Sequence, residues 1–219
     1  GNQIMYRSYT YNSSIDTLSL TSGPTRLDSS GNANHPELVV SPTDQSVTVA
    51  WVNGVSGSGT ISARTKPSAG SWGSIEVTST GAVWTSSNSG INIDQGPSMV
   101  VAPNGTKAFI YIANFGSCGT DYGRTHFVSK AVGASTWTDQ TLSNFCTHAP
   151  GLAVDSSNNF FILGHGHPSN PSCTQMTQIC SVQRTSTGTW NNPVVYANPP
   201  SGDSFDSSIS TKWSAVGWT

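Results

Sequence analysis

The stretch His35-Pro36-Glu37-Leu38-Val39-Val40 opens a unit that occurs three times in the chain. The same pattern returns as Gly96-Pro97-Ser98-Met99-Val100-Val101 and as Ala149-Pro150-Gly151-Leu152-Ala153-Val154. A short turn rich in Pro, Asn, Asp and Ser follows each copy. A second run of β-branched and aromatic residues comes next, and this combination predicts strands joined by tight turns. The repeat therefore predicts an all-β chain.

Each unit then continues in the same order. A third predicted strand ends at a cation, which is Arg64, Lys130 or Arg184. A Gly/Ser/Thr-rich loop leads to a tryptophan and to a fourth predicted strand; these tryptophans are Trp72, Trp137 and Trp190. Four strands every 50–60 residues are typical of the blades of a β-propeller.

The two ends of the chain complement each other. The N-terminal segment resembles a third strand ending at Arg7, followed by a fourth strand near Leu18, and residues 206–218 resemble a first and a second strand. We therefore expect a four-bladed β-propeller in one domain, closed by both termini, which removes exposed sheet edges. The alternative is a fragment of a larger propeller. The expected blades are residues 36–95, 96–148, 149–205, and 206–219 together with 1–35.

The loop that ends in tryptophan resembles the Asp-box, or bacterial neuraminidase repeat, of the sialidase-like propellers. It is carried by Ser68-Ala69-Gly70-Ser71-Trp72, Ala134-Ser135-Thr136-Trp137 and Ser186-Thr187-Gly188-Thr189-Trp190, and the aspartate of the family pattern is missing from all three. The resemblance implies that the tryptophans have a structural, packing role. It also implies an arginine cluster and a Tyr/Glu pair in the enzymes of the family, which the two glutamates, Glu37 and Glu76, do not supply here.

Composition narrows the range of partners. Only 9% of the 219 residues are charged, the net charge is −2, and the nine Lys and Arg are scattered, so we expect no nucleic-acid partner. No apolar run approaches the length needed to span a membrane. Four cysteines without a C-x-x-C pair indicate disulfides and an extracellular or cell-surface location. Of the three pairings, we favour Cys118–Cys146 and Cys173–Cys180, because blade topology puts each pair in loops on one face.

The same topology puts the long loops between strands 2 and 3, and between successive blades, on one face. Such loops on a rigid scaffold are common binding sites. Aromatic, amide and histidine side chains there suit a sugar, whose C–H faces stack on rings while its hydroxyls meet polar groups. The candidate ligand-binding residues are Trp84, Asn114, Phe115, Tyr122, His165, His167 and Asp203.

The same face carries candidate metal ligands. Histidine imidazoles favour zinc, whereas Asp carboxylates around a central channel favour calcium. The candidates are His35, Asp94, His148, His165, His167 and Asp206. The alternative is that the H-x-H pair is hydrogen-bonded or solvated and binds no ion.

One strand of the N-terminal segment carries Tyr6, Tyr9 and Tyr11, which we expect to share a face as an edge-closing core or as a contact strip. The leading functional expectation is a secreted, lectin-like binding or adhesion module, monomeric or homodimeric, with a glycan or a surface protein as partner. The alternatives are a glycoside-processing, sialidase-like enzyme and an interaction domain at the tip of a larger surface filament. No catalytic residue is assigned.

Overall fold

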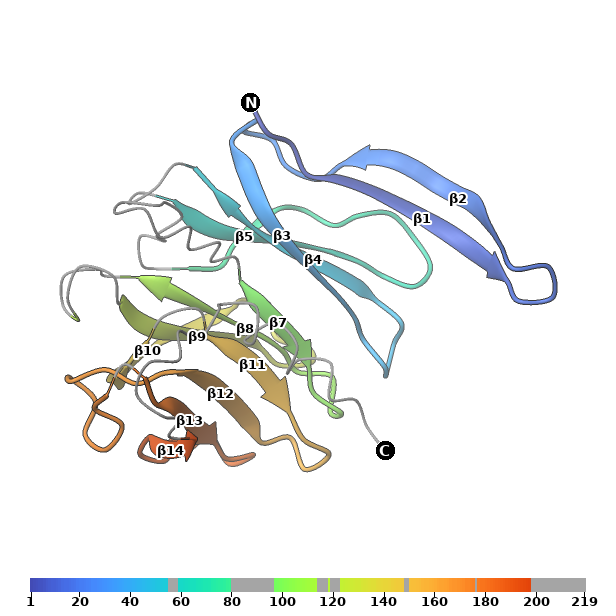
Figure 1. Ribbon diagram of the computed structural model, residues 1–219. Coiled ribbons are helices and arrows are strands. Elements are labelled where there is room, and N and C mark those ends of the chain that lie inside the picture. Colours follow the sequence, from blue (N-terminus) through green and yellow to red (C-terminus); the bar gives the residue numbers. More distant parts are fainter. Residues whose placement is uncertain are drawn as a thin grey trace.

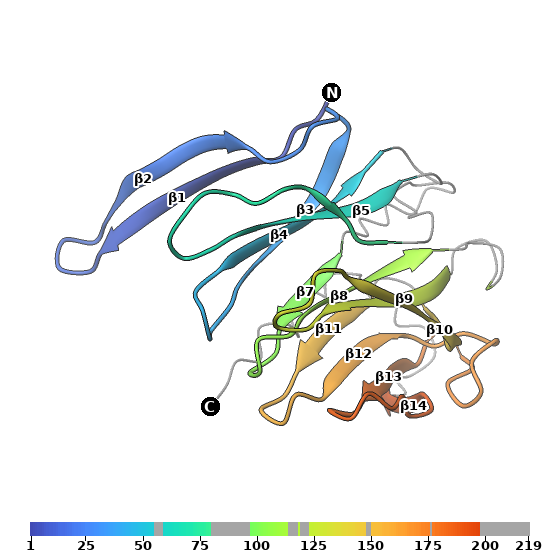
Figure 2. The same ribbon diagram turned by 180° about the vertical axis from the view of Figure 1, so that it is seen from behind.

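The computed structural model describes residues 1–54, 59–79, 97–113, 118, 123–147, 150–175 and 177–197. Within these residues the protein is all-β and holds four small antiparallel sheets (Figures 1 and 2). No helix long and apolar enough to cross a membrane occurs in this part of the chain.

The first sheet is a hairpin of two strands, and the other three sheets are meanders of four strands in chain order. The hairpin consists of β1 (Met5–Asn12) and β2 (Thr17–Arg26). The second sheet consists of β3 (Ala33–Val40), β4 (Val47–Asn53), β5 (Thr60–Lys66) and β6 (Glu76–Val77). The third consists of β7 (Ser98–Val101), β8 (Lys107–Ala113), β9 (Gly123–Lys130) and β10 (Thr138–Thr147). The fourth consists of β11 (Gly151–Val154), β12 (Phe160–His165), β13 (Ile179–Arg184) and β14 (Val194–Ala197).

This arrangement confirms the repeat as a set of four-stranded units. The turn after each first strand is closed by a short polar side chain: the Ser46 N–H donates to Asp44, and the Thr106 N–H donates to Asn104, each at about 3 Å. The expected blade closure by residues 206–219 lies outside the described residues, so the ring itself is a prediction.

The sheets stack face to face in chain order, with the hairpin at one end and β11–β14 at the other (Figure 1). A buried apolar cluster fills each gap. One is centred on Trp51 between the hairpin and β3–β6, one on Phe109 between β3–β6 and β7–β10, and one on Phe127 and Phe160 between β7–β10 and β11–β14. Burial of both sheet faces explains why strands such as β4 and β8 are apolar almost throughout.

The three tryptophans of the repeat pack in these gaps, as predicted. Trp72, Trp137 and Trp190 each lie partly buried against the cluster that separates their own sheet from the sheet before it. Trp190 also donates its indole N–H to Gln140 of the preceding sheet, at 3.0 Å. These side chains join successive units.

The cationic side chains at the ends of the third strands all point toward the preceding sheet. Arg64 donates to the carbonyl of Leu27 at 3.3 Å, and Lys130 pairs with Glu76 at 2.6 Å. The Arg184 guanidinium lies over the Phe127 ring, 5.2 Å from its centroid. Each cation therefore reaches the sheet that precedes its own, which confirms that it is a feature of the repeat.

Both predicted disulfides are present. Cys118 is bonded to Cys146 and Cys173 to Cys180, with Cα separations of 5.8 and 6.1 Å. The side chain of Asn170 links the two bonds, because it accepts from the Cys146 N–H at 2.7 Å and donates to the carbonyls of Cys146 at 3.0 Å and Cys173 at 3.4 Å. Asn170 thus ties the loop after β12 to the end of β10, while the disulfides join Cys118 to the end of β10 and Cys173 to β13. Two such bonds fit an oxidising compartment.

Two expectations from the sequence are wrong. His165 is the last residue of β12 and not a loop residue. Tyr6 does not share a face with Tyr9 and Tyr11, because residues 6 and 9 are an odd number apart in β1 and the extra residues at the two register shifts between them lie in β2. Tyr6 packs edge-on against Trp72, with ring centroids 4.9 Å apart, whereas Tyr9 and Tyr11 are exposed.

Candidate functional site

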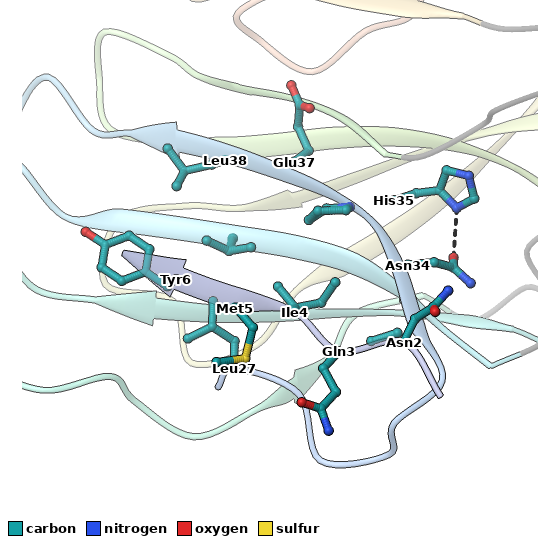
Figure 3. Close-up of a pocket in the computed structure, with 13 residues that line it drawn as sticks. Asn2, Gln3, Ile4, Met5, Tyr6, Leu27, Asn34, His35, Glu37 and Leu38 are labelled. Carbon is teal, nitrogen blue, oxygen red and sulfur yellow. Dashed lines mark hydrogen bonds between the residues drawn. The ribbon is translucent and has the colours of Figure 1, made fainter. Parts of the chain in front are cut away.

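A cleft of about 610 Å³ lies between β1 of the hairpin and β3 of the next sheet (Figure 3). Its floor is apolar and includes Ile4, Leu27 and Val49, which belong to the buried cluster below it. Its polar lining includes Asn2, Gln3, Asn34 and His35.

The cleft exists because the hairpin carries only two strands. In each of the other three sheets, the third strand has two strands on one side and the fourth strand on the other. Among the described residues, β1 pairs only with β2. The β3 face that looks toward the hairpin is therefore partly uncovered, and Leu38 and Val40 on it are 48% and 51% exposed. The space left beside β1 is the cleft.

Asp28 holds the two walls together. Its carboxylate accepts from the Ile4 N–H at 2.8 Å, from the Gly31 N–H at 3.1 Å and from the Arg26 guanidinium at 2.9 Å. Burial of the Asp28 carboxyl by itself raises its pKa, but the hydrogen bonds from Arg26, Ile4 and Gly31 outweigh burial and lower the pKa to about 2. The carboxylate is thus ionised in the fold and holds Ile4, just before β1, beside the loop that leads to β3.

His35 and Asn34 form the polar end of the cleft. The His35 Nδ1 lies 2.8 Å from the Asn34 Oδ1, and Figure 3 shows this contact. His35 has a φ of +48°, a left-handed backbone conformation that turns its side chain away from the regular strand direction. A register shift between β3 and β4 falls at the same place, between Asn34 and Glu37.

Glu37 lies beside this end, but its carboxyl is on the other side of β3. It pairs in register with Ala50, which belongs to the cluster facing β7–β10, whereas its neighbour Leu38 faces the cleft. Burial raises the pKa of Glu37 above its ordinary value. Glu37 therefore shapes the wall with its backbone, and its acid does not face the cleft floor.

The residues predicted from the sequence are only partly brought together. His35 lines the cleft, whereas His165 and His167 lie at the far end of the stack beside the disulfides. The other candidates lie outside the described residues: Trp84, Asp94, Asn114, Phe115, Tyr122, His148, Asp203 and Asp206. These binding roles stay predictions.

His165 and His167 are built into the loop framework. The His165 carbonyl accepts from the Thr147 hydroxyl at 2.9 Å, and the His167 Nδ1 accepts from the Ser169 N–H at 3.1 Å. Burial and the nearby charge of Arg124 lower the pKa of His167. Within the described part of the chain no group of three or more His, Cys, Asp or Glu could hold a metal ion, and the zinc or calcium site stays a prediction.

Sequence reasoning missed one further polar cluster. Tyr111, His126 and Asp139 come together on the face of β8–β10 that looks toward β3–β6. The Tyr111 hydroxyl lies 2.6 Å from Asp139 Oδ2, and His126 Nδ1 lies 2.9 Å from Asp139 Oδ1. All three side chains are buried, and their hydrogen bonds join three neighbouring strands.

Sequence reasoning also missed the cleft residues Asn2 and Gln3, because nothing in their local pattern marks them, and it singled out Tyr6 only as part of a tyrosine strip. Comparison of the chain with family models and with curated proteins gives no match. The geometry of the cleft and the repeat are therefore the basis for assigning a function.

Proposed function

We propose that the protein is a secreted or cell-surface binding module, built as a β-propeller of the Asp-box type, that takes a glycan in the cleft between β1 and β3. The stacked four-stranded meanders, the tryptophan at the same place in each and the two disulfides support the architecture and the location. The observation that carries the function is the cleft itself.

The cleft suits a neutral, hydroxyl-rich ligand. An apolar floor with amide and imidazole groups at its rim matches a sugar ring, whose C–H faces need apolar contact and whose hydroxyls need donors and acceptors. No carboxylate of the cleft lining faces its floor, and a chain with only 9% charged residues offers little to an ionic ligand. The same feature disfavours glycoside hydrolysis there, which needs two carboxyl groups on either side of the bond.

The edge of β1 that faces away from β2 supports a second candidate, since within the described part of the chain β1 pairs with β2 alone. An edge strand beside an apolar cleft is the arrangement that accepts an extended peptide by strand addition. Binding such a peptide would make the protein an interaction domain. The peptide would be held by backbone hydrogen bonds instead of contacts with sugar rings.

A glycan array followed by titration of the best hit tests the first proposal. Leu38→Ala should weaken binding ~10-fold, since it removes apolar contact in the cleft. Val40→Ala is the matched control, because Val40 lies on the same face of β3 and outside the cleft lining. Glycan binding that Leu38→Ala leaves unchanged would place the site elsewhere, and a wholly negative array would refute the glycan.

A further inference from the structure

The face of the hairpin that points away from the stack is apolar and exposed. Tyr9 pairs across the hairpin with Leu20, and Tyr11 pairs with Leu18. These four side chains are 50–68% exposed. The opposite face carries small hydroxyl side chains, such as Ser8 bonded to Ser22 and Thr10 bonded to Thr21. An exposed patch of large cross-strand apolar pairs on one face marks an interaction surface.

The repeat shows what kind of surface covers such a face. In every other sheet the corresponding face, which looks toward the preceding unit, is buried against the sheet before it. The cation at the end of the third strand crosses that contact each time, as Arg64, Lys130 and Arg184 do. Arg7 lies on the face of Tyr9 and Tyr11 and is exposed, although β1 continues beyond it to Asn12 and does not end at this cation as the sequence predicts. The hairpin therefore presents a face made for a preceding β-sheet.

Among the described residues, one sheet face could receive the hairpin face. It is the side of β11–β14 that points away from β7–β10. Phe161 and Leu163 lie on it, since their neighbours Phe160 and Ile162 fill the cluster on the other side. Val194 pairs with Ser181 on the same face and is 56% exposed. Tyr196 lies at the register shift between β13 and β14 and is 58% exposed.

The two apolar faces lie at opposite ends of the stack, with β3–β6 and β7–β10 between them, in both views (Figures 1 and 2). The single-chain ring expected from the repeat spacing would need one chain to bring its own two ends together. We infer that the hairpin face instead docks on the β11–β14 face of a second copy of this chain. The contact extends the existing sheet-on-sheet stacking and buries both end faces. It rests on the propeller arrangement and is independent of the glycan.

The contact is head-to-tail, because it joins two different surfaces. Two copies related by a twofold axis then make it twice and close a ring of two chains. Arg7 lies on the hairpin face that this contact covers.

Analytical ultracentrifugation of the full chain tests the inference. The expected mass is twice the 22.9 kDa of one chain. The double variant Leu18→Thr with Leu20→Thr keeps β-branched residues in the strand and should raise the dissociation constant ~30-fold or more. Val194→Thr with Tyr196→Thr should do the same from the other face. Val132→Thr is the control, because Val132 is 70% exposed in the turn between β9 and β10, away from both faces.

Mixing the two double variants gives the sharpest readout. Each alone has both contacts damaged, whereas a mixed pair keeps one contact in which both faces are intact. Association that returns on mixing supports the head-to-tail contact. A wild-type protein that stays monomeric up to 100 µM overturns the inference and favours the single-chain ring. Dimers that survive the Val194→Thr/Tyr196→Thr change overturn it too, because they would show a symmetric hairpin-to-hairpin contact. Circular dichroism of each variant checks that the strands are retained, and glycan binding is scored separately.

Discussion

Asp28 is the residue whose loss should most clearly separate the hairpin from the rest of the protein. Its carboxylate is completely buried and accepts hydrogen bonds from Ile4, Gly31 and Arg26. The pKa is lowered to about 2 from an ordinary value of 3.8. A carboxyl group with a lowered pKa stabilises the fold above its unfolded-state pKa, and this contribution is lost as the pH falls through the folded value. The difference corresponds to about 2 kcal/mol at pH 7.

The change Asp28→Asn keeps the shape of the side chain and removes its charge. We expect it to lower the free energy of unfolding by about 2 kcal/mol at pH 7. At pH 2.5 the wild-type carboxyl is partly protonated even in the fold, so the difference should fall below about 1 kcal/mol. Urea unfolding followed by tryptophan fluorescence measures both values, and amide hydrogen exchange at Ile4 reports the local opening.

Asp16→Asn is the matched control for this variant. Asp16 lies exposed in the hairpin turn and accepts one hydrogen bond, from the Tyr11 hydroxyl at 3.0 Å. We expect a change within about 0.5 kcal/mol, as for most surface substitutions. A loss for Asp28→Asn that is equally large at pH 7 and pH 2.5 would refute the role of the charge. No loss at pH 7 would refute the whole account of how the cleft walls are joined.

Two further substitutions test the stack. Glu37→Gln should stabilise the protein at pH 7 and make no difference below about pH 4, because burial raises the pKa of Glu37 and penalises only its ionised form. Thermal unfolding across pH 4–8 measures this effect. The control is Glu76→Gln, which loses the ion pair with Lys130 and should not stabilise the protein. Gly164→Ala should cost on the order of 1–3 kcal/mol by the same measurement, since a Cβ there would collide with the Thr147 side chain, and Thr147→Ala should recover part of the loss if the collision is the cause.

The repeat could be predicted because its signals are local. Alternating apolar runs, the polar turns near Asp44 and Asn104 and the tryptophan loops all act within about 60 residues, and the structure confirms strands at each place. The cysteine pairing followed from the same topology. The predicted common face of Tyr6, Tyr9 and Tyr11 is wrong, because Tyr6 and Tyr9 are an odd number of residues apart.

The sequence by itself determined the strand-by-strand order, the packing role of the three tryptophans and the low charge of the surface. Only the tertiary structure decided where the cleft lies, since it depends on Asp28 reaching Ile4, 24 residues away, and on a sheet of two strands facing one of four. Of the predicted site residues in the described chain, His35 alone reached the cleft. The physical reason is that strand patterns arise from neighbouring residues, whereas a cleft arises from surface left uncovered when distant strands pack.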